Sequence, residues 1–423
     1  AEIRSVVSQV LNQLGTSREA QYYLKQYSAD THLQFAVIKI GGAVLEEQLE
    51  PLAAALAFLR NLGLMPIILH GAGPQLDVAL DDAEIPTEKK RGLRVTTPEV
   101  MAVARPVIYR ANRRLVTALE KQGVRAQGIQ HGVFVCDYLD EAELGLVGDI
   151  KTVDLEAIRD VVERGALPVV ACMGESQTGQ VMNINADIAA RELIWKVKPH
   201  KIIFLTGTGG LLDDSGRIIS AISLRTDFDF LVAQDWVHSG MQLKLEQISQ
   251  LLQGLPDSAS VSITSVDNLA KELFTHRGAG TLIRKGEQIL EHAEFTPGLR
   301  KQATQLMEGS FGRQFLPDYF DELPLHCVLS SESNGAMAIV LNGVDGVPYL
   351  DKFAVTPEAQ GAGLGAAVWQ ALIQRCPRLY WRSRTRNPIT PWYFDQADVS
   401  VTRDQWVAFS VGIEAFDQLE RCV

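Results

Sequence analysis

The chain has 423 residues, 46% of them hydrophobic and 22% charged, which is typical of a globular protein too long for one domain. Lys and Arg number 40 against 51 Asp and Glu, and the net charge of -11 disfavours a general attraction to nucleic acid. No apolar run reaches the roughly 18 residues that cross a bilayer, so a membrane role is not expected.

Residues 1–30 carry apolar residues at helical spacing between charged ones, and we expect an N-terminal helical segment there. They lack the continuous apolar stretch of a secretory signal peptide. The five dispersed cysteines never form a Cys-x-x-Cys pair, which favours buried thiols in a reducing compartment over disulfides or zinc. A bacterial cytoplasmic location is therefore favoured, with the mitochondrial matrix as the alternative if a transit segment has been removed.

From Phe35 to Thr206 short β-rich runs alternate with longer helical patterns. This alternation predicts a largely parallel sheet flanked by helices, with ligands at the carboxyl ends of the strands. The candidate strands are Phe35–Ile40, Met65–Leu69, Ala166–Val170 and Lys201–Leu205. The candidate helices are Gln48–Asn61, Pro98–Lys121, Leu155–Arg164 and Ala186–Val197.

Three glycine-bearing turns follow predicted strands. Glycine lets the backbone approach a phosphate closely, and helix N-termini supply N–H donors for anions. A lysine beside such a turn adds a cation for transferring oxygens. One turn alone is as often a plain strand-to-helix connection, but three in one domain favour a phosphate site. The turns are Lys39-Ile40-Gly41-Gly42, His70-Gly71-Ala72-Gly73-Pro74 and Thr206-Gly207-Thr208-Gly209-Gly210.

Two further segments place polar residues at predicted helix starts. Asn183-Ile184-Asn185-Ala186-Asp187 either caps a helix or binds a polar substrate and orients the lysines. Gly240-Met241-Gln242-Leu243-Lys244 is predicted to turn into a helix with Lys244 in its first turn. The helix dipole favours an anion there, so a lysine indicates a ligand.

Residues 30 to 285 resemble the N-acetylglutamate kinases of the amino-acid (carbamate) kinase fold. The resemblance implies transfer of the γ-phosphoryl group of ATP, with Mg²⁺, to the side-chain carboxylate of N-acetylglutamate. It rests on the ordered motifs Lys39-x-Gly41-Gly42, His70-Gly71-x-Gly73-Pro74, Arg94-Val95-Thr96, Asn183-x-Asn185-Ala186-Asp187 and Gly240-Met241-x-x-Lys244.

By this resemblance Lys39 and Lys244 neutralise the transferring phosphoryl group, and Asp187 holds both lysines in place. Arg94 binds a substrate carboxylate with two parallel hydrogen bonds. Family members commonly carry an Asp in place of Gly207 and a Pro in place of Leu243. The remaining substrate contacts are assigned to Gly41, Gly42, Gly71, Asn183 and Asn185, and the nucleotide contacts to Thr206, Gly207, Thr208 and Gly209.

Residues 271–275, followed by Gly278, resemble the arginine-binding segment of feedback-inhibited members. This implies arginine as an effector, with Glu272 and Gly278 at its site. An ordinary helix end with a glycine cap explains these residues equally well. The resemblance also implies a homo-oligomer, with a tetramer favoured.

The sequence pattern changes near Gly278, and we place the boundary between a kinase domain (31–284) and a second domain (285–423) there. The second domain is expected to be an α+β unit. Its predicted strands are Leu325–Ser330, Ala336–Leu341, Tyr349–Val355 and Arg378–Arg382, and its predicted helix is Ala366–Arg375.

The loop from Gln360 to Gly365 lies between a predicted strand and a helix and presents successive N–H groups to a pyrophosphate. A dinucleotide fingerprint is disfavoured because no ribose-binding acid follows, and an incidental glycine turn is the remaining alternative. The loop resembles the acetyl-CoA motif of the GNAT acetyltransferases. With the flanks Tyr349–Val355 and Trp381–Phe394, residues 285–423 resemble the acetyltransferase domain of vertebrate-like N-acetylglutamate synthases.

This second resemblance implies acetyl transfer from acetyl-CoA to the α-amino group of L-glutamate. Arg382 and Arg384 alternate along a strand and are expected on one face. A nucleic-acid patch is the alternative for this arginine cluster, disfavoured by the acidic remainder of the chain. The resemblance assigns acetyl-CoA to Phe353, Ala354, Val355, Gln360, Gly361, Gly363 and Gly365, and glutamate and the acetyl group to Lys352, Arg384, Asn387 and Tyr393.

Together the two domains predict a bifunctional enzyme that runs consecutive steps of arginine biosynthesis, with L-glutamate and N-acetylglutamate as substrates. The alternative is a synthase whose silent kinase domain senses arginine and holds the oligomer together. A non-enzymatic arginine sensor would require both sites to be inactive. No resident metal ion and no nucleic-acid partner are expected.

Overall fold

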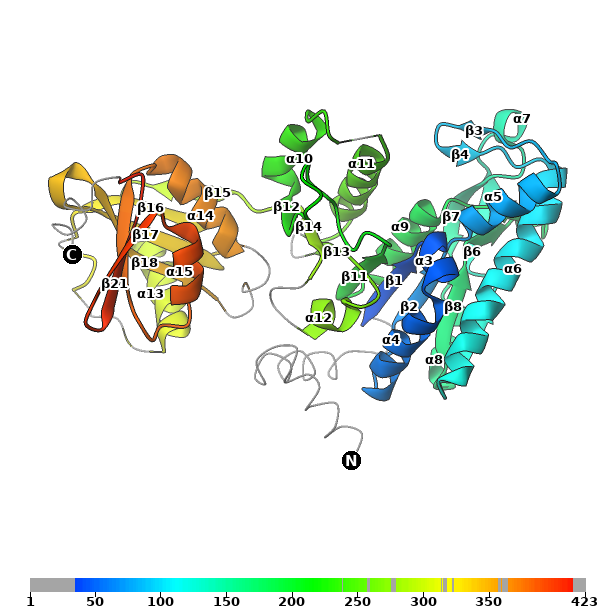
Figure 1. The fold of residues 1–423 in the computed structure, drawn as a ribbon, viewed down its shortest axis with the longest axis horizontal. Helices are drawn as coiled ribbons and strands as arrows, with labels where there is room; N and C mark the ends of the chain where they lie inside the picture. Colours follow the sequence, from blue (N-terminus) through cyan, green and yellow to red (C-terminus); the bar gives the residue numbers. More distant parts are fainter. Residues whose placement is uncertain are drawn as a thin grey trace. The chain divides into compact units, whose positions relative to one another are not determined.

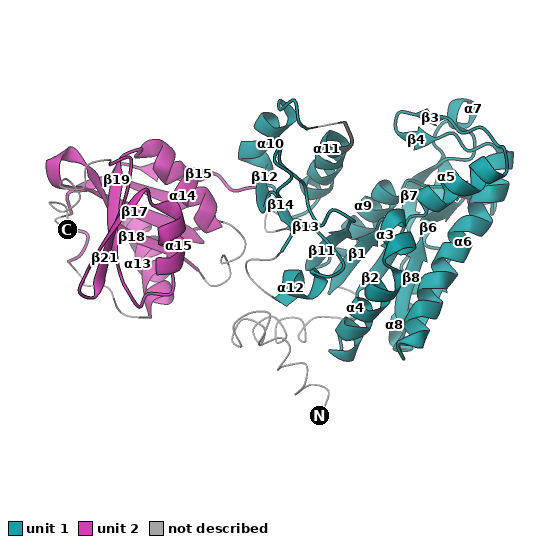
Figure 2. Ribbon diagram, in the orientation of Figure 1, with its two compact units in different colours: residues 1–285 teal, residues 286–423 magenta. Residues whose placement is uncertain are grey.

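The computed structural model describes residues 35–413 except 238, 257–258, 275–278, 313, 315–317, 322, 357–358 and 360–363. The expected helical segment 1–30 lies outside these residues. The chain divides into two compact units, residues 1–285 and 286–423 (Figure 2). Within the described part, none of the helices is long and apolar enough to cross a bilayer.

The first unit is built on an eight-stranded sheet in the order β12-β14-β13-β11-β1-β2-β8-β5 (Figure 1). All neighbouring pairs are parallel except β13–β14. Its central strands are short, almost entirely apolar runs, as expected for strands buried on both faces. The strands are β1 (Ala36–Ile40), β2 (Ile67–His70), β5 (Ala126–Ile129), β8 (Leu167–Ala171), β11 (Lys201–Leu205), β12 (Ala221–Ser223), β13 (Ser260–Thr264) and β14 (Thr281–Arg284).

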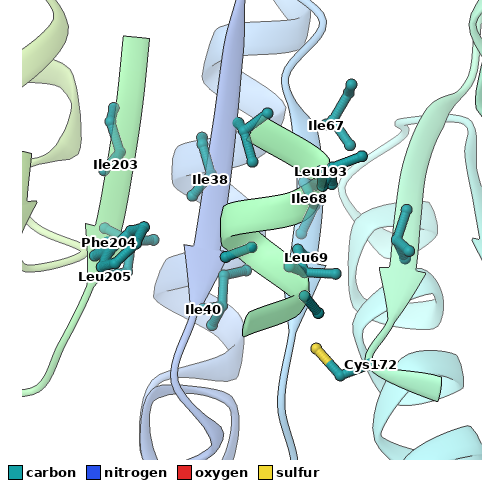
Figure 3. Close-up of a cluster of buried hydrophobic side chains, with 14 of the residues drawn as sticks. Ile38, Ile40, Ile67, Ile68, Leu69, Cys172, Leu193, Ile203, Phe204 and Leu205 are labelled. Atoms are coloured by element: carbon teal, nitrogen blue, oxygen red, sulfur yellow. The ribbon is translucent and has the colours of Figure 1, made fainter. Parts of the chain in front are cut away.

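Helices cover both faces of this sheet. Figure 3 shows α9, with Leu193, lying across the strands that carry Ile38, Ile40 and Ile68, while other helices lie behind the sheet. The helices are α3 (Gly42–Glu47), α4 (Leu49–Asn61), α5 (Gly73–Asp82), α6 (Pro98–Lys121), α7 (Glu141–Leu144), α8 (Glu156–Glu163), α9 (Ala186–Val197), α10 (Leu224–Val232), α11 (Ser239–Gln253) and α12 (Leu269–Phe274).

A four-stranded sheet in the order β10-β9-β6-β7 and a small hairpin, β3–β4, complete the first unit. Neither was predicted from the sequence. Isolated bridges join Thr96 to Gly145 and Val147 to Asn183, so the segment after β4 and the four-stranded sheet are tied together. The strands are β3 (Lys89–Lys90), β4 (Leu93–Arg94), β6 (Phe134–Tyr138), β7 (Gly148–Val153), β9 (Met173–Glu175) and β10 (Val181–Asn183).

The predicted strands and helices of the first domain are present, with their ends moved by no more than two residues. Two of the site predictions are wrong in position. Asn183 ends β10 and does not stand at a helix start. Gly240 lies inside α11, which begins at Ser239, so Lys244 is in the second turn and not the first.

The second unit contains a seven-stranded sheet in the order β15-β16-β17-β18-β19-β21-β20, with β18–β19 as its parallel pair. The predicted helix begins two residues earlier than expected, and β19 continues to Arg384. The elements are β15 (Ile289–His292), α13 (Pro297–Phe311), β16 (Leu325–Ser331), β17 (Ala336–Asn342), a 3₁₀ turn (Val344–Gly346), β18 (Pro348–Val355), α14 (Leu364–Arg375), β19 (Leu379–Arg384), α15 (Thr390–Gln396), β20 (Val399–Arg403) and β21 (Trp406–Val411).

Alternation along β17 builds a core on each face of this sheet. Ala336, Ala338 and Val340 belong to the cluster that contains the apolar residues of α14. Met337 and Ile339 belong to the cluster that contains those of α13. A period of two therefore sends successive side chains to opposite layers.

Strands β18 and β19 diverge along their length. They pair only at Tyr349↔Tyr380 and Leu350↔Trp381, whereas β18 stays paired with β17 as far as Val355. The register with β17 shifts at Asp351, the extra residue of a β-bulge, and such bulges bend a strand. Beyond Leu350, the edge of β18 is therefore not paired with β19.

Candidate active sites

The glycine turns of the first unit meet at one edge of the parallel sheet. Ile40 is in register with both Leu205 and His70, so the turns after β1, β2 and β11 begin at the same level. The Gly41 amide donates to the Leu205 carbonyl at 3.3 Å, and the Gly71 amide donates to the Ile40 carbonyl at 3.2 Å. A phosphate-sized ligand at this edge would therefore meet backbone from three strands at once.

Glycine is required at one of these turns by close approach. A Cβ on Gly42 would lie 2.8 Å from Pro74 Cδ and 3.0 Å from the Gly73 nitrogen, closer than side chains pack. The first and second turns are thus pressed against each other. The Gln75 side-chain amide also donates to the Gly42 carbonyl at 2.7 Å, which fixes this contact.

Lys39 and Asp187 form an ion pair of 2.7 Å between Nζ and Oδ1. Lys39 is the penultimate residue of β1, and Asp187 lies in the first turn of α9. Asn185 caps that helix, its Oδ1 accepting from the amides of Asp187 and Ile188 at 2.8 and 3.2 Å. Asn185 is therefore the N-cap of α9, as one interpretation predicted, whereas the Asp187 side chain pairs with Lys39.

Lys244 of α11 lies within electrostatic range of Lys39 and Asp187. Partial desolvation and then the charge of Lys39 lower the pKa of the Lys244 ammonium, and Asp187 raises it. Lys244 is nevertheless an exposed residue, so its ammonium still contacts solvent. The structure thus brings together the three residues predicted to handle the phosphoryl group.

Arg94 lies in a cavity of about 230 Å³ beside this ion pair. One nitrogen of its guanidinium pairs with Asp77, while Nη1 is buried and lacks a hydrogen-bond partner among the described groups. A buried charged donor without an acceptor is costly, and a ligand carboxylate would satisfy it. The lining includes Gly71, Arg94, Asn183, Asn185, Asp187 and Cys172.

Asn183 faces this cavity from β10. Its Nδ2 donates to Thr96 Oγ1 at 3.0 Å, and that hydroxyl donates to the Arg94 carbonyl at 3.0 Å. Asn183 therefore steadies the Arg94 backbone as well as lining the cavity. The sequence reasoning did not single out Asp77 or Cys172, because no local pattern marks either residue. Burial raises the pKa of the Cys172 thiol to about 12, so it is a neutral part of the wall.

His70 supports the second turn from below. It is fully buried, and Asn112 Nδ2 lies 3.0 Å from its Nε2, while its Nδ1 lies 3.3 Å from the Gly71 carbonyl. Because Asn112 Nδ2 can only donate, His70 accepts at Nε2 and carries its proton on Nδ1. Burial lowers the pKa of His70 to about 4, so the ring is neutral and serves as a support.

The predicted nucleotide loop follows β11. The Thr206 amide donates to the Thr264 carbonyl at 3.0 Å, and Thr208 Oγ1 donates to the Gly210 carbonyl at 2.9 Å. Gly209 has a φ of +73°, in the left-handed region that glycine tolerates. No heavy atom lies within 4 Å of a Cβ placed on Gly207, so the loop is open at this position.

Glu272, assigned to the arginine effector, is a buried residue of α12. Its Oε2 accepts from the Ala279 amide at 2.8 Å, which ties the helix to the segment before β14. Gly278 lies outside the described residues.

In the second unit, three of the residues assigned to acetyl-CoA lie on the part of β18 that has separated from β19. Phe353, Ala354 and Val355 occupy the part of the strand that does not pair with β19. A Cβ on Gly365 would lie 3.0 Å from Val355 Cγ2, so the start of α14 approaches the end of that edge. Gln360, Gly361 and Gly363 lie outside the described residues.

Lys352 belongs to a compact polar group that the sequence did not indicate. Its Nζ pairs with Asp351 Oδ2 at 2.5 Å and lies 5.1 Å from the Tyr319 ring centroid. The Tyr319 hydroxyl donates to the same Asp351 oxygen at 2.5 Å. Burial and then the Asp351 charge raise the Tyr319 pKa, so the phenol stays protonated.

Arg384, Asn387 and Tyr393 lie where β19 turns into α15. The Arg384 carbonyl accepts from the Asn387 amide and from Thr390 Oγ1, each at 2.9 Å. Tyr393 is buried against Trp381 with ring centroids 5.6 Å apart. Arg382 and Arg384 are both exposed and lie over the Trp406 ring, which confirms that they share a face.

Comparison with known proteins agrees with this two-unit organisation. The model of the amino acid kinase family matches residues 34–264, and that of the N-acetyltransferase of N-acetylglutamate synthase matches residues 295–423. The chain is 45% identical to the acetylglutamate kinase of Xanthomonas campestris pv. campestris, over 97% of both chains. It is 31% identical to the mitochondrial N-acetylglutamate synthase of Homo sapiens, over 95% of this chain and 74% of that protein.

The fold also matches that of a solved enzyme over most of the chain. N-acetylglutamate synthase from Neisseria gonorrhoeae, in complex with coenzyme A and N-acetyl-glutamate, matches with a TM-score of 0.63 and 20% identity, over 94% of this chain and 98% of that chain. The fold is therefore an amino acid kinase fold with a parallel-dominated sheet, followed by a GNAT acetyltransferase unit. The chain is an enzyme, a transferase that joins a kinase unit to an acyltransferase unit, and it belongs to the amino acid kinase family.

Proposed function

We propose that this chain catalyses two reactions: acetyl transfer from acetyl-CoA to L-glutamate in the second unit, and phosphorylation of N-acetylglutamate by ATP in the first. The product of the second unit is then the substrate of the first, as in consecutive steps of arginine biosynthesis. The names of its relatives, an acetylglutamate kinase and an N-acetylglutamate synthase, support both halves of this proposal.

The kinase half rests above all on Arg94, whose buried Nη1 lacks a hydrogen-bond partner among the described groups. Arg94 lines the same cavity as Asp187, the carboxylate that holds Lys39. A dicarboxylic substrate can give one carboxylate to Arg94 and direct the other toward the lysines. N-acetylglutamate has this shape, and its amide group suits the polar side chain of Asn183.

In the proposed reaction, an oxygen of the side-chain carboxylate attacks the γ-phosphorus of ATP, and ADP leaves. The carboxylate is already ionised at neutral pH, so no general base is needed. Lys39 and Lys244 stabilise negative charge on the transferring oxygens, with Asp187 fixing Lys39. The glycine turns supply backbone N–H groups for the phosphates. Catalysis is then positioning and electrostatics.

Mg²⁺ is proposed to enter with the nucleotide. Among the described residues of the first unit, no group of three His, Cys, Asp or Glu side chains lies close enough to hold an ion. This fits an ion held mainly by ATP phosphates and water, as Mg²⁺ commonly is. Its charge would add to that of the two lysines.

The synthase half rests on the part of β18 that does not pair with β19. A pantetheine chain carries amide groups that can pair with this edge, as an added strand would. The neutral glutamate amine would attack the thioester carbonyl, the carbon–sulfur bond would break, and the proton lost by the amine would end on the departing sulfur, giving the free coenzyme A thiol. Lys352 and Arg384 supply cations for the two carboxylates of glutamate. Of the two, Arg384 has no ion pair with an acid among the described residues, whereas Lys352 is paired with Asp351.

Regulation and assembly complete the proposal. Arginine would act as the effector near Glu272, whose carboxylate now joins α12 to the segment before β14. A cationic ligand competing for that carboxylate would loosen this link. Assembly as a homo-oligomer, with a tetramer favoured, rests on the family resemblance.

Two assays on one preparation test the proposal. N-acetylglutamate and ATP should yield an acyl phosphate, trapped with hydroxylamine, and glutamate with acetyl-CoA should release free thiol. Lys244→Ala should abolish the first reaction, with the second as its internal control. Acyl phosphate formation that survives Lys244→Ala overturns the kinase assignment. Thiol release without any acyl phosphate from the unsubstituted protein favours a synthase with a silent kinase unit.

A further inference from the structure

Three metal-ligating side chains, none of them assigned to acetyl transfer, come together in the second unit. His326 and Cys327 are consecutive in β16, and Cys376 directly follows α14. One ligand atom of each lies within 4.8 Å of the other two, and both cysteines are buried and free of disulfides. The long separation of the cysteines along the chain explains why their spacing argued against a zinc site.

The dimensions of this cluster suit a tetrahedral ion. Zinc binds cysteine sulfur at about 2.3 Å and histidine nitrogen at about 2.0 Å, which separates neighbouring ligand atoms by about 3.8 Å or less. The ligand atoms therefore need to close by at most about 1 Å to surround an ion. Thiolate and imidazole are the ligands that soft divalent metals prefer.

The imidazole of His326 is already oriented for such a role. Its Nδ1 lies 3.1 Å from Asn342 Oδ1, and the Asn342 amide nitrogen donates to the Leu325 carbonyl at 3.2 Å. Because the oxygen of Asn342 faces the ring, Nδ1 carries the proton and Nε2 keeps a lone pair. Metal-bound histidines commonly have their second nitrogen held in this way.

Two features of the surroundings suit a bound cation. Arg375 is paired with Glu291 at 2.7 Å, so its charge is largely compensated. The carboxyl end of α14 adds the negative end of a helix dipole.

We propose that His326, Cys327 and Cys376 bind one soft divalent metal ion of the zinc class, with water as the fourth ligand. His326 is only half-buried, which gives water access to the open position. The ion would fasten the carboxyl end of α14 to β16. Since α14 begins beside the end of β18, the site would be structural and would stiffen the helix that borders the acetyl-CoA edge.

Cobalt titration of the reduced, full-length protein under anaerobic conditions tests this site. Co²⁺ should bind with one equivalent per chain and give the intense absorption of thiolate-to-cobalt charge transfer. Cys327→Ala and Cys376→Ala should each remove that absorption. The matched controls are Cys136→Ala, another buried thiol, and Cys422→Ala, and both should bind like the parent. The same absorption in Cys376→Ala would place the ion elsewhere and overturn the proposal.

Asn342 provides a finer test. Removing a group that orients a metal-bound histidine commonly costs ten- to a hundred-fold in affinity. Asn342→Ala should therefore weaken Zn²⁺ binding by about that factor, measured by competition with a chromophoric chelator. Unchanged affinity would contradict the role of His326 as a ligand.

X-ray absorption of the unsubstituted protein loaded with one equivalent of Zn²⁺ is independent of how the variants fold. Two sulfur ligands at about 2.3 Å and nitrogen or oxygen at about 2.0 Å are expected. A shell of nitrogen and oxygen alone would mean an adventitious ion only and would overturn the proposal.

Discussion

Arg94 of the first unit and Arg384 of the second are both assigned to a substrate carboxylate, yet their surroundings differ. The Arg94 side chain is 8% exposed, is paired with Asp77 and keeps one buried nitrogen unsatisfied. Arg384 is exposed and lies 5.4 Å from the Trp406 ring centroid. The first guanidinium is therefore held in place before substrate arrives, whereas the second rests on an aromatic face.

This difference extends to the other cations of each site. Lys39 is held by Asp187, which comes from a different element, and its side chain is 16% exposed. Lys352 is held by its neighbour in the same strand. Charges act more strongly when they are shielded from water and fixed by the fold. We therefore expect the kinase site to be the more sensitive of the two to loss of a single charge.

The largest effect is expected for Lys39→Ala. Loss of a preorganised cation beside the transferring oxygens should lower kcat for acyl phosphate formation by about 10³-fold or more, while acetyl transfer continues. Hydroxamate trapping measures the first reaction and thiol release the second. A loss below tenfold would contradict the contrast between the two sites.

The two arginines give a direct comparison. Arg94→Ala should lower kcat/KM for N-acetylglutamate by about 10²-fold, because a buried charge-assisted bond contributes about 3 kcal/mol. Arg384→Ala should lower kcat/KM for glutamate by about tenfold, because an exposed charge-assisted hydrogen bond contributes about 1.5 kcal/mol. Steady-state kinetics at several substrate concentrations checks both. Equal losses would show that burial does not separate the two sites.

The buried His70 predicts an acid sensitivity confined to the first unit. Its folded pKa of about 4 lies below the ordinary histidine pKa of 6.5, so between these values the unfolded chain binds a proton that the folded chain does not. Stability is therefore full above pH 6.5 and falls as the pH drops toward 4, by about 3 kcal/mol in all.

Pulse proteolysis in urea, read separately from peptides of each unit, measures this loss. His70→Gln keeps a polar side chain but cannot titrate, so the first unit should show a shallower pH dependence in the variant than in the parent. The second unit serves as the internal reference. Parallel pH profiles for parent and variant would remove His70 as the cause.

The smallest effect is expected for Gly207→Asp. The position has open space, so the aspartate usual in this family should fit without loss of stability. One added hydrogen bond to the nucleotide would lower KM for ATP by about fivefold, which corresponds to about 1 kcal/mol. A higher KM for ATP would show that this chain binds the nucleotide differently from its relatives.

The meeting of the glycine turns could be predicted from the sequence, because each follows an apolar strand and parallel strands end at one edge. Lys39, Asp187 and Lys244 could be grouped through the order of their motifs. The start of α11 could not be predicted, because the residue types of Ser239 and Gly240 are equally typical of a turn that precedes a helix.

Contacts between segments that are distant in the chain could not be predicted from the sequence. Asp77 of α5 reaches Arg94 of β4, and Tyr319 reaches Asp351 from a segment before β16, with no local pattern in either case. The sheet β10-β9-β6-β7 was missed because β9 and β10 have three residues each, too few to show an alternation. Such features depend on tertiary packing rather than local propensity.

The divergence of β18 from β19 has a dynamic consequence. Backbone amides of Phe353 and Ala354 that face away from β17 have no pairing with β19, so their hydrogens should exchange with solvent faster than those of the paired half of β18. A bound pantetheine would act as the missing neighbour and slow that exchange. The sheet of the second unit would thus be completed by its own substrate, and the extent of protection would report how fully the site is occupied.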